Sequence, residues 1–257
     1  MRSSEWVSFV YFAALTAIAW LRPLPPGRRP TITATGIVMC SAIWLLARNG
    51  TSIARDWAPA IVVLIGYFLS GRFFCRPSER FERWLKACDQ RLLGDPATSF
   101  VHWPRAVLAY LELVYMGTFL VVPAGFAALA WAGRSDLADH FWTMVLAAEF
   151  GAFGPLAFIQ SRPPWAFERR ATTLDSVHDL GSLIVERFSI QANTFPSGHA
   201  AGSLAVALAI IGALPWTGAA FLIVAASISL ACIVGRYHYV VDVLAGAALA
   251  LGIWIVN

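Results

Sequence analysis

The stretch WTGAAFLIVAASISLACIVG at residues 216–235 contains no charged side chain. A helix of about 20 apolar residues spans the hydrocarbon core of a bilayer, where the backbone must satisfy its own hydrogen bonds. Comparable apolar runs recur along the chain, and none alternates with the period of two that is typical of a strand. The sequence therefore predicts an all-α, polytopic transmembrane helix bundle.

The apolar runs give about eight candidate spans, within a range of roughly six to eight. They cover residues 5–22, 31–48, 57–74, 105–132, 139–160, 197–214, 216–235 and 238–256. The first run is expected to be a retained helix and not a cleaved signal, because Arg22-Pro23 follows it in place of a small-residue cleavage site.

The composition excludes most soluble classes. Hydrophobic residues make up 58% of the chain and charged residues 13%, about half of what soluble domains carry. The net charge of +4 comes from basic residues between the apolar runs, where lipid headgroups and topology rules place them. We therefore expect the membrane bilayer as a partner and no nucleic acid, while the oligomeric state stays open. The four cysteines show neither a disulfide framework nor metal-ligand spacing.

An interfacial amphipathic helix is predicted in the long connection 75–104. Ser78 suits its N-cap, and Gly94-Asp95-Pro96 suits its end. Its residues divide into an apolar face and a polar face, as expected for a helix that lies in the membrane interface. The apolar face comprises Phe81, Trp84, Leu85, Cys88 and Leu92, and the polar face Arg80, Arg83, Lys86, Asp89, Gln90 and Arg91.

A first candidate catalytic motif is Pro196-Ser197-Gly198-His199, which lies at the start of an apolar run. Proline suits the first turn of a helix, and the exposed N–H groups of Ser197, Gly198 and His199 would form an anion site at its positive end. Gly198 would let phosphate oxygens approach the backbone. His199 faces that anion and is a candidate general acid.

His238 and Asp242 form an i, i+4 pair at the start of the last span. A carboxylate on Nδ1–H fixes the histidine tautomer and leaves Nε2 unprotonated toward a substrate. A carboxylate so close to an apolar span is functional by default. His238 is thus a candidate nucleophile, and Asp242 is the group that orients it.

Arg236 and Arg162 each lie at the mouth of a span and are candidates for an electrostatic clamp on a transferring phosphoryl group. Arg162 begins the connection 161–196, whose length favours a functional loop. No carboxylate-rich cluster or glycine-rich nucleotide loop is visible in the sequence. We therefore predict phosphoryl transfer through a phosphohistidine, with no metal and no cofactor.

Two stretches, Asn193–His199 and Gly235–Gly246, resemble the second and third signature motifs of the type 2 phosphatidic acid phosphatase superfamily. This superfamily includes lipid phosphate phosphatases and, on a related branch, inositol phosphorylceramide synthases; residues 85–96 resemble the interfacial segment of that branch. The resemblance implies that His238 is the nucleophile, that Asp242 orients it and that His199 is the general acid. It also implies that Ser197 and Gly198 bind the phosphate. It divides the chain into N-terminal transmembrane helices of unassigned role at 1–75 and a catalytic domain at 76–257.

Two positions depart from the family pattern. The third motif has an arginine six residues before the nucleophilic histidine, where this chain has Cys232. Arg236 stands about one helical turn further on and would face a similar way if that stretch is helical. The first motif pairs a lysine with Arg-Pro; Arg162-Pro163 supplies the second half, but Pro155 occupies the lysine position. Arg169 or Arg170 would have to replace that lysine.

Other ionisable residues are weaker candidates for a catalytic role. Glu112, with Tyr115 one turn away, and Glu149 lie inside predicted spans. We interpret both carboxyl groups as structural hydrogen-bonding partners before functional ones. His102 and His140 have no partner at a useful spacing.

The sequence favours an integral membrane phosphohydrolase that removes phosphate from lipid phosphates or diphosphates. A phosphotransferase of the inositol phosphorylceramide synthase type would use the same phosphohistidine but pass the phosphoryl headgroup to an alcohol. A non-catalytic transporter or scaffold would not need the two histidines, and its polar groups are expected at mid-span and not at span ends.

The protein is expected in a bacterial plasma (inner) membrane, but two arguments conflict on which face holds the site. Most basic residues fall on the side of the bundle that carries Arg162 and Arg236, and the positive-inside rule places that side in the cytoplasm. The family resemblance in bacteria implies the outer face. A reporter fused after Asn257 would decide, because the predicted spans put the C-terminus opposite the site.

Overall fold

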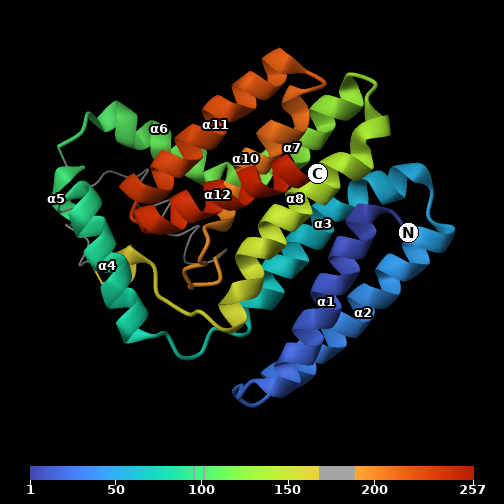
Figure 1. Cartoon of the computed structure of the whole chain (residues 1–257), viewed down its shortest axis with the longest axis horizontal. Helices are drawn as coiled ribbons and strands as arrows, with labels where there is room; N and C mark the ends of the chain where they lie inside the picture. Colours follow the sequence, from blue (N-terminus) through green and yellow to red (C-terminus); the bar gives the residue numbers. More distant parts are fainter. Residues whose placement is uncertain (95, 101, 168–188) are drawn as a thin grey trace.

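A computed structural model describes residues 1–94, 96–100, 102–167 and 189–257. Within these residues the chain is helical, with one isolated bridge between Ser161 and Asn193 and no sheet, which confirms the predicted all-α class. The α-helices are α1 Ser3–Leu21, α2 Arg28–Asn49, α3 Ser52–Gly71, α4 Glu79–Leu93, α5 Pro96–Ser99, α6 Arg105–Met116, α7 Thr118–Trp131, α8 Ala138–Phe153, α10 Gly198–Ile211, α11 Pro215–Val234 and α12 Val240–Val256 (Figure 1).

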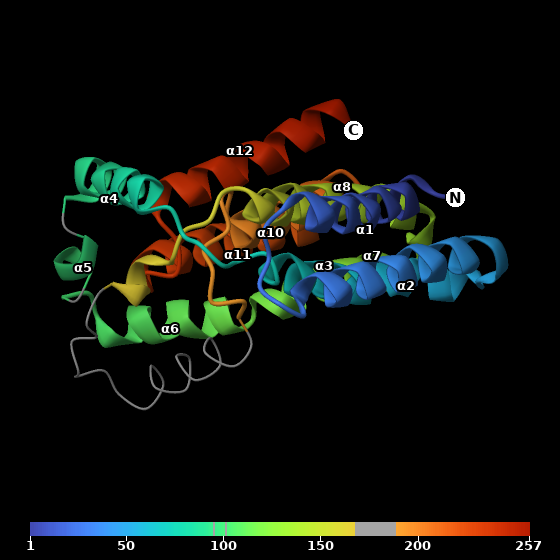
Figure 2. The ribbon, with the colours of Figure 1, turned by 90° about the horizontal axis from the view of Figure 1, so that it is seen from below.

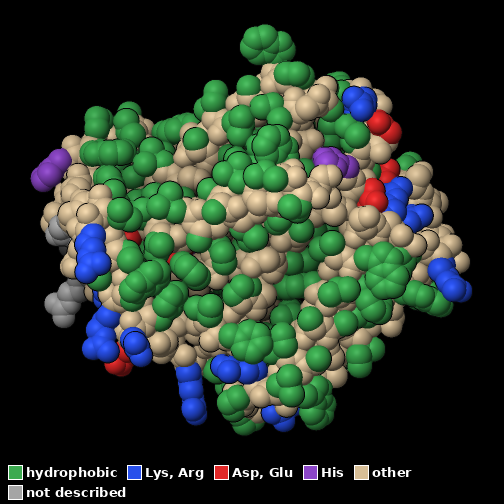
Figure 3. All heavy atoms as spheres, in the orientation of Figure 1, with side chains coloured by type: hydrophobic (Ala, Val, Ile, Leu, Met, Phe, Trp, Pro, Cys, Tyr) green, Lys and Arg blue, Asp and Glu red, His purple; other side chains and the backbone are tan. Residues whose placement is uncertain are grey.

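The outer surface of the bundle suits lipid. Large apolar side chains point outward, including Trp131 (95% exposed), Trp216 and Ile223, and hydrophobic side chains cover much of the face in Figure 3. Among the described helices, α1, α2, α3 and α11 are long and apolar enough to span a membrane by length and composition, and the bent pair α6 and α7 would make a fifth span. The helices α10 and α12 are apolar but shorter. This pattern indicates a membrane protein.

The predicted span over 105–132 is not one straight helix, because it breaks at Gly117 into α6 and α7, bent by 65°. The two halves have different partners: α6 packs on α11, and α7 packs mainly on α10. Tyr115 in the last turn of α6 stacks on Tyr237 with ring centroids 3.7 Å apart. A glycine between the halves allows the chain to bend toward both partners.

The centre of the bundle is built by α8 and α10, which lie between the N-terminal helices and the C-terminal helices (Figures 1 and 2). Small residues let neighbouring helices approach this centre closely. A Cβ at Gly125 of α7 would lie 2.4 Å from Val206 Cγ1 on α10, so that position has no room for a side chain. The helix α8 is apolar around most of its circumference, as expected for a central helix.

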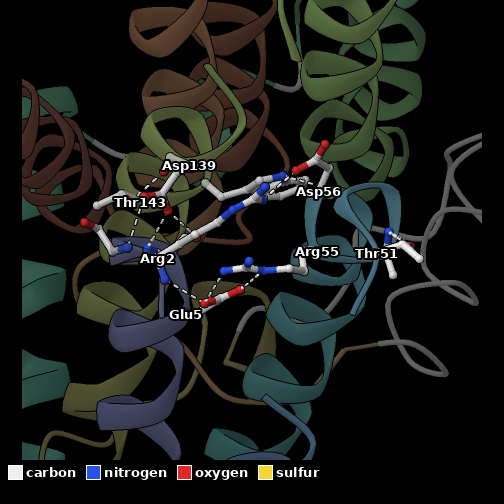
Figure 4. A network of polar contacts seen from close by, with 11 residues as sticks. Arg2, Glu5, Thr51, Arg55, Asp56, Asp139 and Thr143 are labelled. Carbon is white, nitrogen blue, oxygen red and sulfur yellow. Dashed lines mark hydrogen bonds and ion pairs between the residues drawn. The ribbon is translucent and has the colours of Figure 1, made fainter. Parts of the chain in front are cut away.

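Polar contacts tie α1 and α3 to each other and to α8 at the end of the bundle where both termini lie (Figures 1 and 4). Arg55 of α3 forms a bidentate pair with Glu5 of α1, at 2.7 and 3.0 Å. Arg2 pairs with Asp56, and Asp139 at the start of α8 accepts hydrogen bonds from the backbone at the start of α1. The division of the chain at residue 75 stays a prediction, and the two parts are packed together.

The amphipathic helix predicted after residue 75 is confirmed as α4. Ser78 caps its start by accepting a hydrogen bond from the Phe81 N–H at 3.3 Å. Gly94 ends it in the positive-φ region, at +74°, where glycine is favoured. In Figures 1 and 2, α4 lies at the end of the bundle opposite the termini and beside the start of α12.

Candidate active site

The first predicted histidine, His199, lies in the first turn of α10. Ser197 is the N-cap of this helix, and its side chain accepts from the Ala200 N–H at 3.4 Å. Gly198 is required for packing, because a Cβ there would lie 2.4 Å from Phe153 Cε1 on α8. The start of α10 is therefore pressed against the central helix, and His199 is held at the end of the bundle that α4 covers.

The second predicted histidine, His238, lies in a tight turn between α11 and α12. The Tyr237 and His238 N–H groups both donate to the Cys232 carbonyl at 2.9 Å, and Arg236 adopts a left-handed conformation with φ of 59°. This turn ends α11 and points the His238 ring into the bundle, where it is buried. Burial lowers the pKa of the His238 imidazole, so the ring is neutral and its lone pair is available at physiological pH.

Asp242 lies directly behind His238, as the i, i+4 spacing predicts. Its Oδ2 is 3.5 Å from His238 Nδ1 and accepts a hydrogen bond from the Tyr239 N–H at 3.0 Å. The 3.5 Å separation is longer than a typical hydrogen bond, and His238 Nδ1 has no other partner among the described residues. A small rotation of the ring would complete the bond that fixes the tautomer.

Backbone contacts bring the two histidine motifs together. The Ser197 N–H donates to the Asp242 carbonyl at 2.9 Å, and a Cβ at Gly246 would lie 2.5 Å from the Ser197 carbonyl oxygen. The start of α12 therefore packs on the start of α10 at backbone distance. The His199 and His238 rings meet almost perpendicularly, with centroids 5.6 Å apart and planes at 84°.

A third group, Tyr115 of α6, joins the histidines. Its hydroxyl lies 3.3 Å from His199 Nε2, and its ring stacks on Tyr237. Tyr237 in turn donates to Glu112 Oε1 at 2.7 Å, in line with the interpretation of Glu112 as a structural hydrogen-bonding group. The sequence placed Tyr115 one turn from Glu112, but nothing in it indicated that Tyr115 contacts His199.

The two histidines line a small cavity of about 30 Å³, which is room for about two water-sized groups. Its remaining walls include Tyr115, Thr194 and Trp165. The Trp165 N–H donates to the Arg236 carbonyl at 3.1 Å, so the chain after α8 closes over the turn. Both described ends of the connection 161–196 thus contribute to the site, as expected; Arg169 and Arg170 lie outside the described residues.

The two predicted clamp arginines are each paired with a carboxylate of α4. Arg162 binds Glu82 through two side-chain hydrogen bonds, Nε to Oε1 at 3.0 Å and Nη2 to Oε2 at 2.8 Å. Arg236 Nη1 lies 3.0 Å from Asp89 Oδ2. Burial raises the pKa of Glu82, but the hydrogen bonds from Arg162 outweigh it and hold the pKa below its usual value. Glu82 is therefore ionised at neutral pH.

These pairs correct the predicted orientation of α4. Its buried residues are Glu82, Leu85 and Asp89, whereas Trp84 and Leu92 of the predicted apolar face are about half exposed. The two carboxylates lie seven residues apart on one helical face and meet the two arginines there. The spacing is visible in the sequence, but the partners on distant loops are not.

The structure also corrects two geometric arguments. The stretch from Cys232 to Arg236 is not helical throughout, because α11 ends at Val234, so the condition for Arg236 to face the way of Cys232 is not met. The expectation of exposed N–H groups is wrong for Ser197 and Gly198, since the first donates to Asp242 and the second to Thr194 Oγ1 at 3.3 Å. The phosphate-binding roles of Arg162, Arg236, Ser197 and Gly198 stay predictions.

Replacing Asp89 by alanine is expected to destabilise this end of the protein. Arg236, which is 13% exposed, loses its carboxylate, and the Val240 N–H at the start of α12 loses its acceptor at 2.8 Å. Breaking a buried pair costs about 3 kcal/mol at the lower end of the usual range. Thermal unfolding in detergent measures the change, with Glu79→Ala on the exposed face of α4 as the matched control. Equal Tm values for the two variants would contradict this role of Asp89.

The fold and the site together define a helical membrane protein with paired histidines and a buried carboxylate at one end of the bundle. The sequence model of the PAP2 superfamily matches residues 83–256, and the chain belongs to this superfamily. Membership confirms the resemblance to the type 2 phosphatidic acid phosphatases and supports a phosphatase-type enzyme. The match leaves α1, α2 and α3 outside. No curated protein and no solved structure matches the chain.

Proposed function

We propose that the protein is an integral membrane phosphohydrolase that releases phosphate from lipid phosphates or lipid diphosphates through a phosphohistidine on His238. The observation that carries this proposal is the buried pair of perpendicular histidines on one cavity, with Asp242 behind His238. Membership in the PAP2 superfamily supports phosphatase-type chemistry. The apolar helices around the site are consistent with a substrate that lies in the bilayer.

In the first step, the lone pair of His238 Nε2 attacks phosphorus and the bond from phosphorus to the lipid oxygen breaks. Asp242 stabilises the positive charge that develops on the imidazole. His199, which enters this step as an imidazolium, gives a proton to the departing lipid oxygen, which leaves as an alcohol or, from a diphosphate, as a lipid monophosphate. The product of this step is a phosphorylated His238.

In the second step, water attacks phosphorus and the bond to Nε2 breaks. His199, now neutral, takes a proton from the attacking water and is ready for the next cycle. Inorganic phosphate is released and His238 is neutral again. All proton transfers in this scheme use His199, which explains why its ring faces the His238 ring.

Arg162 and Arg236 complete the proposal as phosphate-binding residues, together with Ser197 and Gly198. Neither arginine lines the cavity itself, but their chain neighbours Pro163 and Tyr237 do. A bound phosphate would share them with Glu82 and Asp89, and a bidentate guanidinium can bridge such anions. This arrangement would hold the arginines in place before substrate arrives.

The purified protein is expected to release inorganic phosphate from a lipid phosphate in detergent with EDTA present, because the proposed chemistry uses only protein side chains. The measurement is phosphate release, with and without an alcohol acceptor. Loss of activity on chelation, restored by Mg²⁺, would contradict the metal-free mechanism. A phosphorylated alcohol formed in place of phosphate would identify a phosphotransferase. Activity that survives loss of both histidines would favour a non-catalytic role for this site.

A further inference from the structure

A second cavity, of about 180 Å³, lies on the other side of His199. It is enclosed by α3, α7 and α8, and most of its walls are apolar. They include Ala60, Leu64, Phe119, Val122 and Pro123. A cavity of about 150 Å³ with such a lining binds a benzene-sized apolar molecule, so this one has room for the first part of a hydrocarbon chain.

The second cavity adjoins the proposed active site. His199, Tyr67 and Phe153 line both cavities. A chain placed in the second cavity would therefore begin beside the histidine that gives a proton to the lipid oxygen. This position is where the carbons next to a phosphate ester must lie if the phosphorus is near His238.

The outer side of this cavity lies at the exterior surface of the helix bundle. Ile61 of α3 lines the cavity and is 63% exposed. Leu64 and Phe119 also line it, and both are 37% exposed. An apolar opening on the lipid-facing surface lets a hydrocarbon chain pass from the bilayer without crossing water. The helix α3 forms one wall of this opening although it lies outside the matched segment 83–256.

One polar side chain in the cavity has no evident structural task. Glu149 of α8 is 9% exposed and lines the cavity beside His199. Among the described residues it makes no hydrogen bond and no ion pair. Its carboxyl group lies in a groove left by two glycines of α10, since a Cβ at Gly202 would be 1.9 Å from Glu149 Oε1 and one at Gly198 would be 3.3 Å from Oε2.

A buried carboxyl group without a partner is costly, because desolvation is not offset by a hydrogen bond. A ligand in the cavity would offset it if the ligand carried a hydrogen-bonding group. A hydroxyl suits this position best, because it donates to an ionised carboxylate and accepts from a neutral acid. Because Glu149 Oε2 lies beside Gly198, the residue before His199, that hydroxyl would be on the carbons nearest the phosphate ester.

We propose that this cavity binds the hydrocarbon chain of the substrate, with α3 as one wall, and that Glu149 hydrogen-bonds a hydroxyl on the first carbons of that chain. The substrate class is thus a long-chain phosphate ester with a hydroxyl close to the phosphate. The inference rests on the proposed function, because it takes His199 as the residue beside the scissile bond.

Filling the cavity tests the chain site. Val122 of α7 is buried against the cavity, whereas Leu120 on the same helix is 70% exposed and outside it. Val122→Phe is expected to raise KM at least about tenfold for hexadecyl phosphate and leave p-nitrophenyl phosphate turnover near wild type. Ala60→Phe on α3 should do the same, and Leu120→Phe should behave as wild type. Turnover of the short substrate shows that each variant is folded.

Equal effects of Val122→Phe and Ala60→Phe on both substrates, or none on either, would overturn the chain site. A wild-type protein that releases phosphate from neither substrate would instead overturn the proposed function. The two failures are therefore distinguishable.

A pair of substrates tests Glu149. Wild-type kcat/KM is expected to be about tenfold higher for 2-hydroxyhexadecyl phosphate than for hexadecyl phosphate, the usual effect of one such hydrogen bond. Glu149→Leu should remove this preference by slowing the hydroxylated substrate only, and Glu149→Gln should retain most of it. The Tm of Glu149→Leu is expected to equal or exceed that of wild type, because no protein contact is lost. A lower Tm with an unchanged preference would show a structural role and overturn the assignment.

Discussion

Replacement of His238 by alanine is expected to abolish phosphate release, because the substitution removes the proposed nucleophile. The ring is buried, lies 3.5 Å from the Asp242 carboxylate and faces His199 across the cavity. His199 also lines that cavity, but its proposed task is proton transfer. Steady-state phosphate release in detergent, with Tm as a check of folding, measures the effect.

The matched control for this variant is His140→Ala. His140 is exposed at the opposite end of the bundle, where it contacts Asn257 at 3.1 Å. We expect this control to keep wild-type activity. A folded His238→Ala variant with a near wild-type rate would show that the nucleophile is wrongly assigned.

Replacement of His199 by alanine is expected to slow hydrolysis of an alkyl phosphate by about 10²–10⁴-fold, the usual contribution of a general acid–base group. The loss should be much smaller for phosphorylation of the enzyme by p-nitrophenyl phosphate, because nitrophenolate leaves without a proton. Single-turnover rates for the two substrates separate the leaving-group step from the rest of the cycle.

The exposed His102 provides the matched control for this comparison, and His102→Ala is expected to show wild-type rates with both substrates. An equal loss with both substrates in the His199 variant would mean that His199 supports folding or substrate position and not departure of the lipid oxygen.

Local patterns in the sequence were sufficient for much of the fold. The apolar runs predict the helices, and Ser78 and Gly94 correctly predict the start and end of α4. The break at Gly117 was not predicted, because it depends on α6 and α7 packing on different helices. Residue 117 is also embedded in a run that is apolar on both sides, so hydropathy gives no signal there.

In the candidate site, too, contacts between residues close in the sequence could be predicted, whereas contacts between distant segments could not. The i, i+4 spacing correctly indicated that Asp242 lies beside His238, but His238 precedes α12 and the two atoms are 3.5 Å apart. The partners of Arg162 and Arg236 could not be predicted, because Glu82 and Asp89 come from a helix more than seventy residues away in the chain. For Gly198, the sequence indicated contact with phosphate, whereas the structure gives packing on Phe153 as the reason for glycine.

The most direct test of the central claim is to trap the phosphorylated enzyme. Wild-type protein and the His199→Ala and His238→Ala variants would be mixed with radiolabelled p-nitrophenyl phosphate, stopped in alkaline detergent and mapped by peptide. We predict a label on His238 that is stable in alkali and lost in acid, as expected for a phosphorus–nitrogen bond. It should accumulate in His199→Ala, where water is no longer deprotonated, and be absent in His238→Ala. A label that persists in His238→Ala, or no label in any of the three proteins while wild type turns over, would contradict the account.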